Sequence, residues 1–121
     1  MNLLALALLS IGLSVAAQFL LKAGMTGEAV RGALAGPLSL RLAGALAADW
    51  RILAGFALYG LGAIAWLGVL ARWDVSKAYP LVGLGFVATL AVGFLQGEQV
   101  TLARAAGVLL ICTGVFLVAR S

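Results

Sequence analysis

The first long apolar run of the chain covers residues 3–24 and reads LLALALLSIGLSVAAQFLLKAG. A helix rises 1.5 Å per residue, so about 20 apolar residues are needed to cross roughly 30 Å of bilayer hydrocarbon. This run meets that length, and its one charge, Lys22, lies near its end. Because the run is longer than the apolar core of a secretory signal peptide and has no basic stretch before it, we interpret it as a retained transmembrane span.

Three further apolar runs of similar length follow, and the few charged residues of the chain separate them. They cover residues 52–71, 78–96 and 102–119. Trp50 and Trp73 lie just outside the ends of the second run, where aromatic anchors usually meet the membrane interface. The sequence therefore predicts an all-α membrane protein whose residues 1–121 form a single domain of four transmembrane helices.

The composition agrees with a membrane protein and argues against several functional classes. Hydrophobic residues make up 64% of the 121 residues and charged residues 10%, whereas a soluble domain carries about 25% charged residues. The chain has no histidine and four acidic residues, and no pair of ionisable groups is placed for acid–base work. We therefore expect no catalytic residue, no metal site and no cofactor. The net charge of +4 comes from dispersed bases, which suit membrane flanks better than nucleic acid.

The connection between the first two runs, residues 25–51, is the longest. Its first half is rich in glycine and reaches Pro37, so we expect it to be irregular. Its second half predicts a short interfacial helix over residues 38–48, with a disordered loop as the alternative. The apolar face of this helix would hold Leu38, Leu42, Ala45 and Leu46, opposite Arg41 and Asp49.

The bases give only a weak signal for orientation in the membrane. An even number of spans places both termini on one side, and cytoplasmic loops usually hold the excess of Lys and Arg. The side of the termini holds Arg72, Lys77 and Arg120, and the other side holds Arg31, Arg41, Arg51 and Arg104, with Lys22 near the boundary. This small difference favours termini outside the cell and is also compatible with a dual topology.

The first span carries polar side chains at every fourth position: Ser10, Ser14, Gln18 and Lys22. This spacing places them along one side of a helix. Lipid offers no hydrogen-bond partner, and polar residues inside a membrane usually face a bundle interior or a wet cavity. We predict a polar wall along a substrate path, with Lys22 holding an anionic group near its mouth. In the alternative, Lys22 extends to the interface and Gln18 bonds a neighbouring helix.

The second span places Tyr59, Gly62, Ala63 and Trp66 on one helical face. The small residues allow another backbone to approach closely. The two rings are expected either to line a cavity wall or to pack against a neighbouring helix.

The third span is expected to begin near Pro80, whose missing N–H does little harm in a first helical turn. Gly83 and Gly85 follow. Two glycines this close weaken a helix, so they predict either a bend, which is useful to a transporter, or a close helix crossing.

The last hairpin and the fourth span hold two structural features. Glu98 and Gln99 are expected to cap the amino end of the fourth helix, and Arg104 is expected to pair with Glu98. Within the helix, a seam of residues at helical spacing, Gly107, Ile111 and Gly114, is suited to contact with a second subunit. Four helices enclose little volume, so a solute path would require such a partner.

These motifs resemble, over essentially the whole length of the chain, the four-helix members of the drug/metabolite transporter superfamily, which includes EamA-like proteins. Residues 107–115 are similar to the fourth helix of the small multidrug resistance transporters, which is their dimer seam. That branch implies antiparallel dimers that export cationic compounds in exchange for protons. Its chemistry requires a glutamate in the middle of the first helix, where this chain has Ser14. A serine does not exchange protons near neutral pH, which argues against that chemistry here.

The subunits of the aminoarabinose–undecaprenyl-phosphate flippase match more of the motifs. The resemblance covers residues 14–18 with Lys22, residues 78–81 with Phe86 and Val87, and Glu98. It implies a lipid carrier with a phosphate head, for which Lys22 is a charge partner. Together with the polar faces of the spans, it predicts one substrate-binding set: Ser14, Gln18, Lys22, Tyr59, Trp66 and Tyr79.

The first functional hypothesis is thus a flippase for a polyprenyl-phosphate sugar in the bacterial inner membrane, not an enzyme. It would work as a homodimer or as a heterodimer with a sister four-helix protein. The alternatives are a multidrug-type exporter of small cationic solutes and an accessory subunit of a membrane complex.

Overall fold

The structure is a computed structural model that describes residues 2–36 and 40–121. Within these residues, four helical stretches are long and apolar enough to cross a membrane. They are α1 (Leu3–Met25), α4 (Trp50–Leu70), the stretch Val75–Leu95 and α7 (Leu102–Arg120). Each matches a predicted span to within three residues at either end, so the predicted all-α fold with four spans is confirmed.

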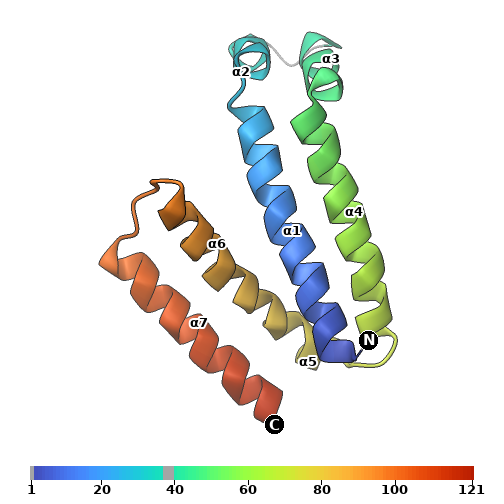
Figure 1. Cartoon of the computed structure of the whole chain (residues 1–121), viewed down its shortest axis with the longest axis vertical. Coiled ribbons are helices and arrows are strands. Elements are labelled where there is room, and N and C mark those ends of the chain that lie inside the picture. Colours follow the sequence, from blue (N-terminus) through green and yellow to red (C-terminus); the bar gives the residue numbers. More distant parts are fainter. Residues whose placement is uncertain (1, 37–39) are drawn as a thin grey trace.

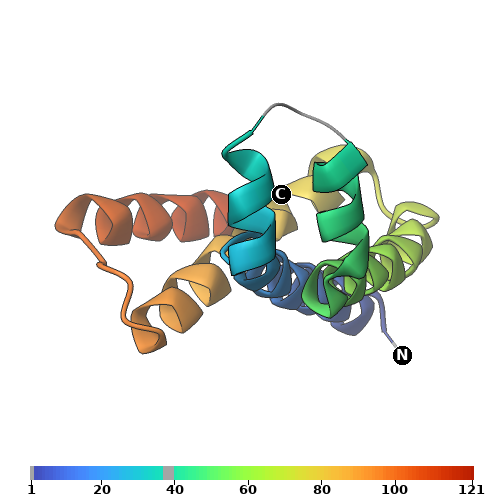
Figure 2. The same cartoon turned by 90° about the horizontal axis from the view of Figure 1, so that it is seen from above.

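The helices form two antiparallel hairpins that lean apart (Figure 1). Helices α1 and α4 lie side by side along their length, whereas α6 (Leu84–Leu95) and α7 form the second hairpin. Both termini lie at one end of the molecule, which we call the terminal end; the opposite end is the far end (Figure 1). Two short helices, α2 (Glu28–Leu34) and α3 (Leu40–Ala48), lie at the far end of the first hairpin (Figure 2).

The first hairpin packs closely because glycines of α4 face α1. A Cβ atom at Gly62 would lie 3.1 Å from the carbonyl oxygen of Ser10, and one at Gly55 would lie 3.2 Å from that of Ala17. Small residues at a membrane helix interface let two backbones approach in this way. The predicted close approach at Gly62 is therefore present, with α1 as the partner.

The core lies at the terminal end, where the two hairpins meet. Its buried side chains come from α1, α4, α7 and the start of the third span: Ala7, Ile11, Val69, Ala78, Leu81 and Val115. Val115 is the one buried residue among those described in α7. Away from this core the hairpins diverge, so their apolar outer faces are left for lipid.

The third span differs from the prediction in where it starts and in its helix type. It begins with α5 (Val75–Ala78), continues as a 3₁₀ segment, η1 (Tyr79–Gly83), and ends with α6. Pro80 therefore lies one turn further inside the span than predicted, at the start of η1. Because proline cannot donate an α-helical hydrogen bond, a change of helix type at this point is expected.

The first two glycines of the third span, Gly83 and Gly85, mark close helix crossings. A Cβ atom at Gly83 would lie 2.7 Å from Cγ2 of Ile111 on α7, and one at Gly85 would lie 3.2 Å from Cγ2 of Ile11 on α1. The predicted alternative of a close crossing is thus present on both sides of the span. These two contacts set how α6 lies between α1 and α7.

The long connection contains one more helix than predicted. The prediction that its first half is irregular was wrong, because α2 forms there. This helix buries Val30 and Ala33, which lie three residues apart on one helical face. The predicted interfacial helix is confirmed as α3. Its predicted apolar face is half-buried at Leu42, Ala45 and Leu46, while Arg41 is exposed; Leu38 lies outside the described residues.

Side-chain caps begin three of the spans. Asn2 accepts a hydrogen bond from the backbone N–H of Ala5, Asp49 from that of Arg51, and Thr101 from that of Arg104. Each cap satisfies one of the backbone donors that the first turn of a helix leaves free. The prediction that Glu98 or Gln99 caps the fourth helix was wrong, because Thr101 directly precedes its first turn.

Candidate functional site

A cavity of about 520 Å³ lies between α1, α4 and the third span; we call it the central cavity. The two polar faces predicted from the sequence meet in it. Ser10, Ser14 and Gln18 line it from α1, and Tyr59, Gly62, Ala63 and Trp66 line it from α4. Residues as far apart in the chain as Gln18 and Tyr59 (41 positions) or Ser10 and Gly62 (52 positions) are therefore brought together by the antiparallel packing of α1 and α4.

Two hydrogen bonds connect α1 to α4 along the polar wall. The buried hydroxyl of Ser10 donates to the carbonyl oxygen of Gly62 at 2.6 Å. About two helical turns toward the far end, Nε2 of Gln18 donates to the hydroxyl oxygen of Tyr59 at 2.5 Å. The first bond satisfies a buried serine, and the second holds an amide and a phenol at the surface of the cavity.

Ser14 lies between these two bonds and lines the same wall. In the described part of the chain its hydroxyl has no hydrogen-bond partner, so it can bond a ligand. The amide oxygen of Gln18 and the hydroxyl hydrogen of Tyr59 remain available as well, because the bond between these side chains uses other atoms. The wall thus offers donors and acceptors that suit hydroxyl groups.

The third span forms the opposite, apolar wall of the central cavity. Val82, Gly85 and Phe86 lie there, and Ile11 and Val15 of α1 extend the apolar surface. Trp66 lies partly in the core and partly on the cavity surface. A ligand in the central cavity would therefore meet hydrogen-bonding groups on one side and hydrocarbon on the other.

Thr89 is a lining residue that the sequence reasoning missed. Its hydroxyl donates to the carbonyl oxygen of Gly85 at 2.7 Å, one turn back along α6. It was detectable as the only hydroxyl-bearing residue in the otherwise apolar run of residues 84–95. Together with Phe86 it also lines a second space of about 290 Å³ between α6 and α7, the α6–α7 hollow.

Lys22 lies outside the lining of the central cavity, one helical turn beyond Gln18 toward the far end. Its ammonium group lies 3.8 Å from a carboxylate oxygen of Glu98, in the connection between α6 and α7. The predicted pair of Glu98 with Arg104 was wrong: the Arg104 guanidinium donates instead to the carbonyl oxygen of Gln99 at 2.8 Å. Lys22 thus has an anionic partner near the end of the cavity, supplied by its own chain.

Tyr79 does not join the other predicted site residues. It lies at the start of η1 near the terminal end, its side chain is exposed, and it lines neither the central cavity nor the α6–α7 hollow. Of the predicted substrate-binding set, the structure brings together Ser14, Gln18, Tyr59 and Trp66. The third span joins the lining only from Val82 onward, three residues after Tyr79.

The predicted subunit seam on α7 divides between two environments. Ile111 packs against Gly83 of the same chain, and Gly107 lines the α6–α7 hollow. Gly114 faces open space, since a Cβ atom there would meet nothing within 4 Å among the described residues. Gly107 and Gly114 therefore leave a part of α7 uncovered.

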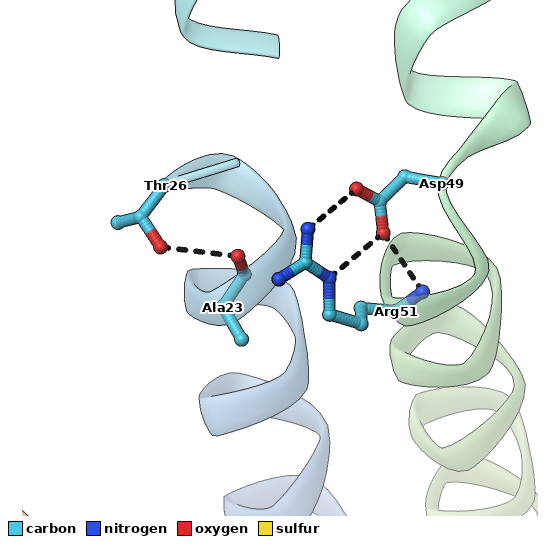
Figure 3. A network of polar contacts seen from close by, with 4 residues as sticks. All are labelled: Ala23, Thr26, Asp49 and Arg51. Atoms are coloured by element: carbon cyan, nitrogen blue, oxygen red, sulfur yellow. Dashed lines mark hydrogen bonds and ion pairs between the residues drawn. The ribbon is translucent and has the colours of Figure 1, made fainter. Parts of the chain in front are cut away.

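An ion pair within the chain segment that begins α4 lies at the far end of the first hairpin. Arg51 donates to both carboxylate oxygens of Asp49, from Nε at 3.2 Å and from Nη2 at 3.0 Å (Figure 3). The hydrogen bonds from Arg51 hold the pKa of Asp49 below its ordinary value, against the opposing effect of partial burial. The guanidinium lies beside the end of α1, where Thr26 bonds the carbonyl oxygen of Ala23 (Figure 3).

The described walls of the central cavity have polar groups but no charged side chain. No acidic or basic residue lines it within residues 2–36 and 40–121, and its polar side-chain groups are hydroxyls, one amide and the indole N–H of Trp66. Such groups bind a ligand through hydrogen bonds, and charge enters only near the far end, at Lys22 and Glu98.

No protein-family model matches the chain, and neither does any curated protein or any solved structure.

Proposed function

We propose that this protein is a flippase that moves a polyprenyl-phosphate sugar across the bacterial inner membrane. The observation that carries the proposal is the central cavity, which combines a hydrogen-bonding wall and an apolar wall between three membrane-crossing helices. Its volume of about 520 Å³ falls within the range of roughly 300–1,000 Å³ that is usual for ligand sites.

Each part of such a lipid has a matching surface. The hydroxyls of a sugar suit Ser14, Gln18 and Tyr59, which would replace the water that the sugar loses inside the membrane. The phosphate suits Lys22, one turn beyond Gln18, because a basic residue near the membrane surface attracts anionic head groups. The polyprenyl chain suits the apolar wall of the central cavity, which Ile11, Val82 and Phe86 line.

One observation favours a flippase over an exporter of small cations. An exporter that exchanges cations for protons needs an ionisable group, such as a carboxylate, in its site. The lining of the central cavity has no carboxylate among the described residues. Glu98 lies outside this lining and pairs with Lys22.

We further propose that a second subunit, identical or a sister four-helix protein, completes the path. Most of α7 is exposed, and the central cavity is walled by helices on only part of its circumference. A partner would cover these surfaces. With no proton-exchanging residue in the cavity lining described here, movement would follow the gradient of the lipid or the consumption of its product.

Transport of a fluorescent undecaprenyl-phosphate sugar in proteoliposomes tests the proposed function. We expect the wild type to speed its movement between leaflets well above empty liposomes. Gln18→Leu and Tyr59→Phe should each lower the rate about fivefold, the factor for one lost hydrogen bond of ~1 kcal/mol. Gln96→Leu, at an exposed position outside both hollows, serves as the control and should leave the rate unchanged.

Other outcomes would exclude the proposal. Proton-driven uptake of a quaternary ammonium dye, with no movement of the lipid, would identify an exporter. An inactive protein that captures one specific membrane partner would identify an accessory subunit.

A further inference from the structure

The ion pair between Lys22 and Glu98 is the one link, among the described residues, in which charged side chains join the two hairpins at the far end. Its atoms Nζ and Oε2 lie 3.8 Å apart, and the side chains are 64% and 39% exposed. An exposed pair at this distance is weak. A ligand that binds Lys22 or Glu98 more strongly can therefore break the pair easily.

The turn that follows α6 places the Glu98 carboxylate toward α1. Gly97 adopts a φ of +88°, which favours glycine. The N–H of Glu98 then donates to the carbonyl oxygen of Gly93 at 2.9 Å, and the N–H of Gly97 to that of Phe94 at 3.1 Å. These two bonds form a Schellman motif, which ends the helix and reverses the chain.

The carboxylate itself folds back over the end of α6. A Cβ atom at Gly93 would lie 3.2 Å from the carboxyl carbon of Glu98, so a side chain at Gly93 would press on the carboxylate. The turn needs only backbone hydrogen bonds, and the cap of the next helix is supplied by Thr101. The carboxylate is thus not required for either helix end, and its contact with Lys22 needs another explanation.

We propose that Glu98 is a specificity-determining residue that occupies, in the ligand-free protein, the place beside Lys22 taken by the phosphate of the lipid. This inference rests on the proposed function. A phosphate carries more charge than a carboxylate and has more acceptor oxygens, so it displaces Glu98 from Lys22. A neutral lipid cannot displace Glu98, so Glu98 restricts binding beside Lys22 to lipids with anionic head groups.

Displacement also changes the link between the hairpins. When phosphate holds Lys22, the connection between α6 and α7 is released from α1 at the far end, while the core at the terminal end stays packed. Binding of an anion would therefore free the hairpins to separate beside the central cavity. Entry of the lipid and loss of the ion pair become one event.

Binding of undecaprenyl phosphate to the purified protein in detergent, measured by native mass spectrometry, tests this inference. Glu98→Gln removes the competing charge and should tighten binding about fivefold, which corresponds to ~1 kcal/mol for an exposed ion pair. Glu98→Ala should act in the same way, while Lys22→Gln should weaken binding. In the Lys22→Gln background, Glu98→Gln should have no further effect, because the competition requires Lys22.

Two controls make the result specific. Glu28→Gln removes an exposed acid at the same end of the molecule and should leave binding unchanged. Undecaprenol, which has no phosphate, should bind the wild type and Glu98→Gln equally. Melting temperatures of all variants show whether each one is folded.

The outcomes separate this inference from the function on which it rests. If neither the wild type nor any folded variant binds undecaprenyl phosphate, the proposed function and this inference fail together. If the wild type binds and Glu98→Gln binds equally or more weakly, this inference alone fails. An effect of Glu98→Gln that persists in the Lys22→Gln background would also overturn it.

Discussion

The polar side chains of α1 face α4 and the central cavity, where they find hydrogen-bond partners that lipid does not offer. Ser10 bonds the backbone of Gly62, and Gln18 bonds Tyr59. Both bonds depend on the close approach of α1 and α4, and that approach requires a residue without a side chain at position 62. The absence of a side chain at Gly62 therefore allows both the close packing of α1 against α4 and the hydrogen bond from Ser10.

Gly62→Ala should destabilise the protein. The added Cβ would lie 3.1 Å from the carbonyl oxygen of Ser10, so α1 must move and the hydrogen bond from Ser10 must weaken. We expect the free energy of unfolding, measured by titration from mild detergent into SDS, to fall by about 1–3 kcal/mol. Gly60→Ala, where nothing lies within 4 Å, is the matched control. Equal stability of the two variants would contradict the close packing.

Within single helices, starts and ends are determined by caps and by the residues that interrupt regular hydrogen bonding. Asp49 caps α4, and Pro80 marks the change from α5 to the 3₁₀ segment η1. Asp49 also pairs with Arg51, so one carboxylate both begins a helix and binds the base beside it (Figure 3). This arrangement makes the start of α4 sensitive to pH.

The Asp49 cap should lose its stabilising effect in acid. Its folded-state pKa lies below the ordinary value because of the hydrogen bonds from Arg51. The ionised carboxylate therefore stabilises the fold above the unfolded pKa of about 4, and this contribution disappears as the pH falls through the lower folded pKa. Asp49→Asn should be less stable than the wild type at pH 7, and the difference should shrink below pH 4.

Thermal unfolding at pH 7 and at several values below pH 4 measures this difference. Asp74→Asn is the control, because the Asp74 side chain makes no capping hydrogen bond at the start of α5. A gap between wild type and Asp49→Asn that stays constant down to the lowest pH would refute the role given to the carboxylate.

For the whole molecule, the main feature is that the two hairpins are joined by a buried core at one end and by the exposed Lys22–Glu98 ion pair at the other. The buried residues Ile11, Val69 and Val115 lie near the terminal end, and the Lys22–Glu98 pair lies at the far end. The buried core thus lies at one end, and the proposed opening would occur at the other. Helix α7, with most of its surface exposed, extends along the outside of the second hairpin (Figure 2).

Gly114→Leu should weaken the association of subunits if α7 forms their contact. No described residue of the chain comes within 4 Å of a Cβ atom at Gly114, so the variant should fold normally. A leucine would nevertheless hold a partner helix away, and we expect self-association in detergent to weaken at least tenfold by analytical ultracentrifugation. Gly60→Leu adds the same bulk at an open position of α4 and should have no effect. A wild type that stays monomeric would exclude a homodimer.

Local composition was enough to predict the spans, because membrane crossing depends on the length and hydrophobicity of a continuous run. The polar faces of α1 and α4 could be predicted as well, since helical periodicity alone places Ser14 with Gln18 and Tyr59 with Trp66. Their meeting in one cavity required the antiparallel packing of the two helices. The helix α2 was missed because a glycine-rich segment gains its helical structure from burial of Val30 and Ala33, a tertiary effect.

The partners of charged residues and the place of Tyr79 were decided by the way the helices cross. Lys22 and Glu98 lie 76 positions apart, and no local pattern connects them. Their contact depends on the turn at Gly97 and on the crossings of Gly83 with Ile111 and of Gly85 with Ile11. Hydrophobicity fixes which segments enter the membrane, whereas the shapes of side chains at each crossing fix which ends of those segments meet.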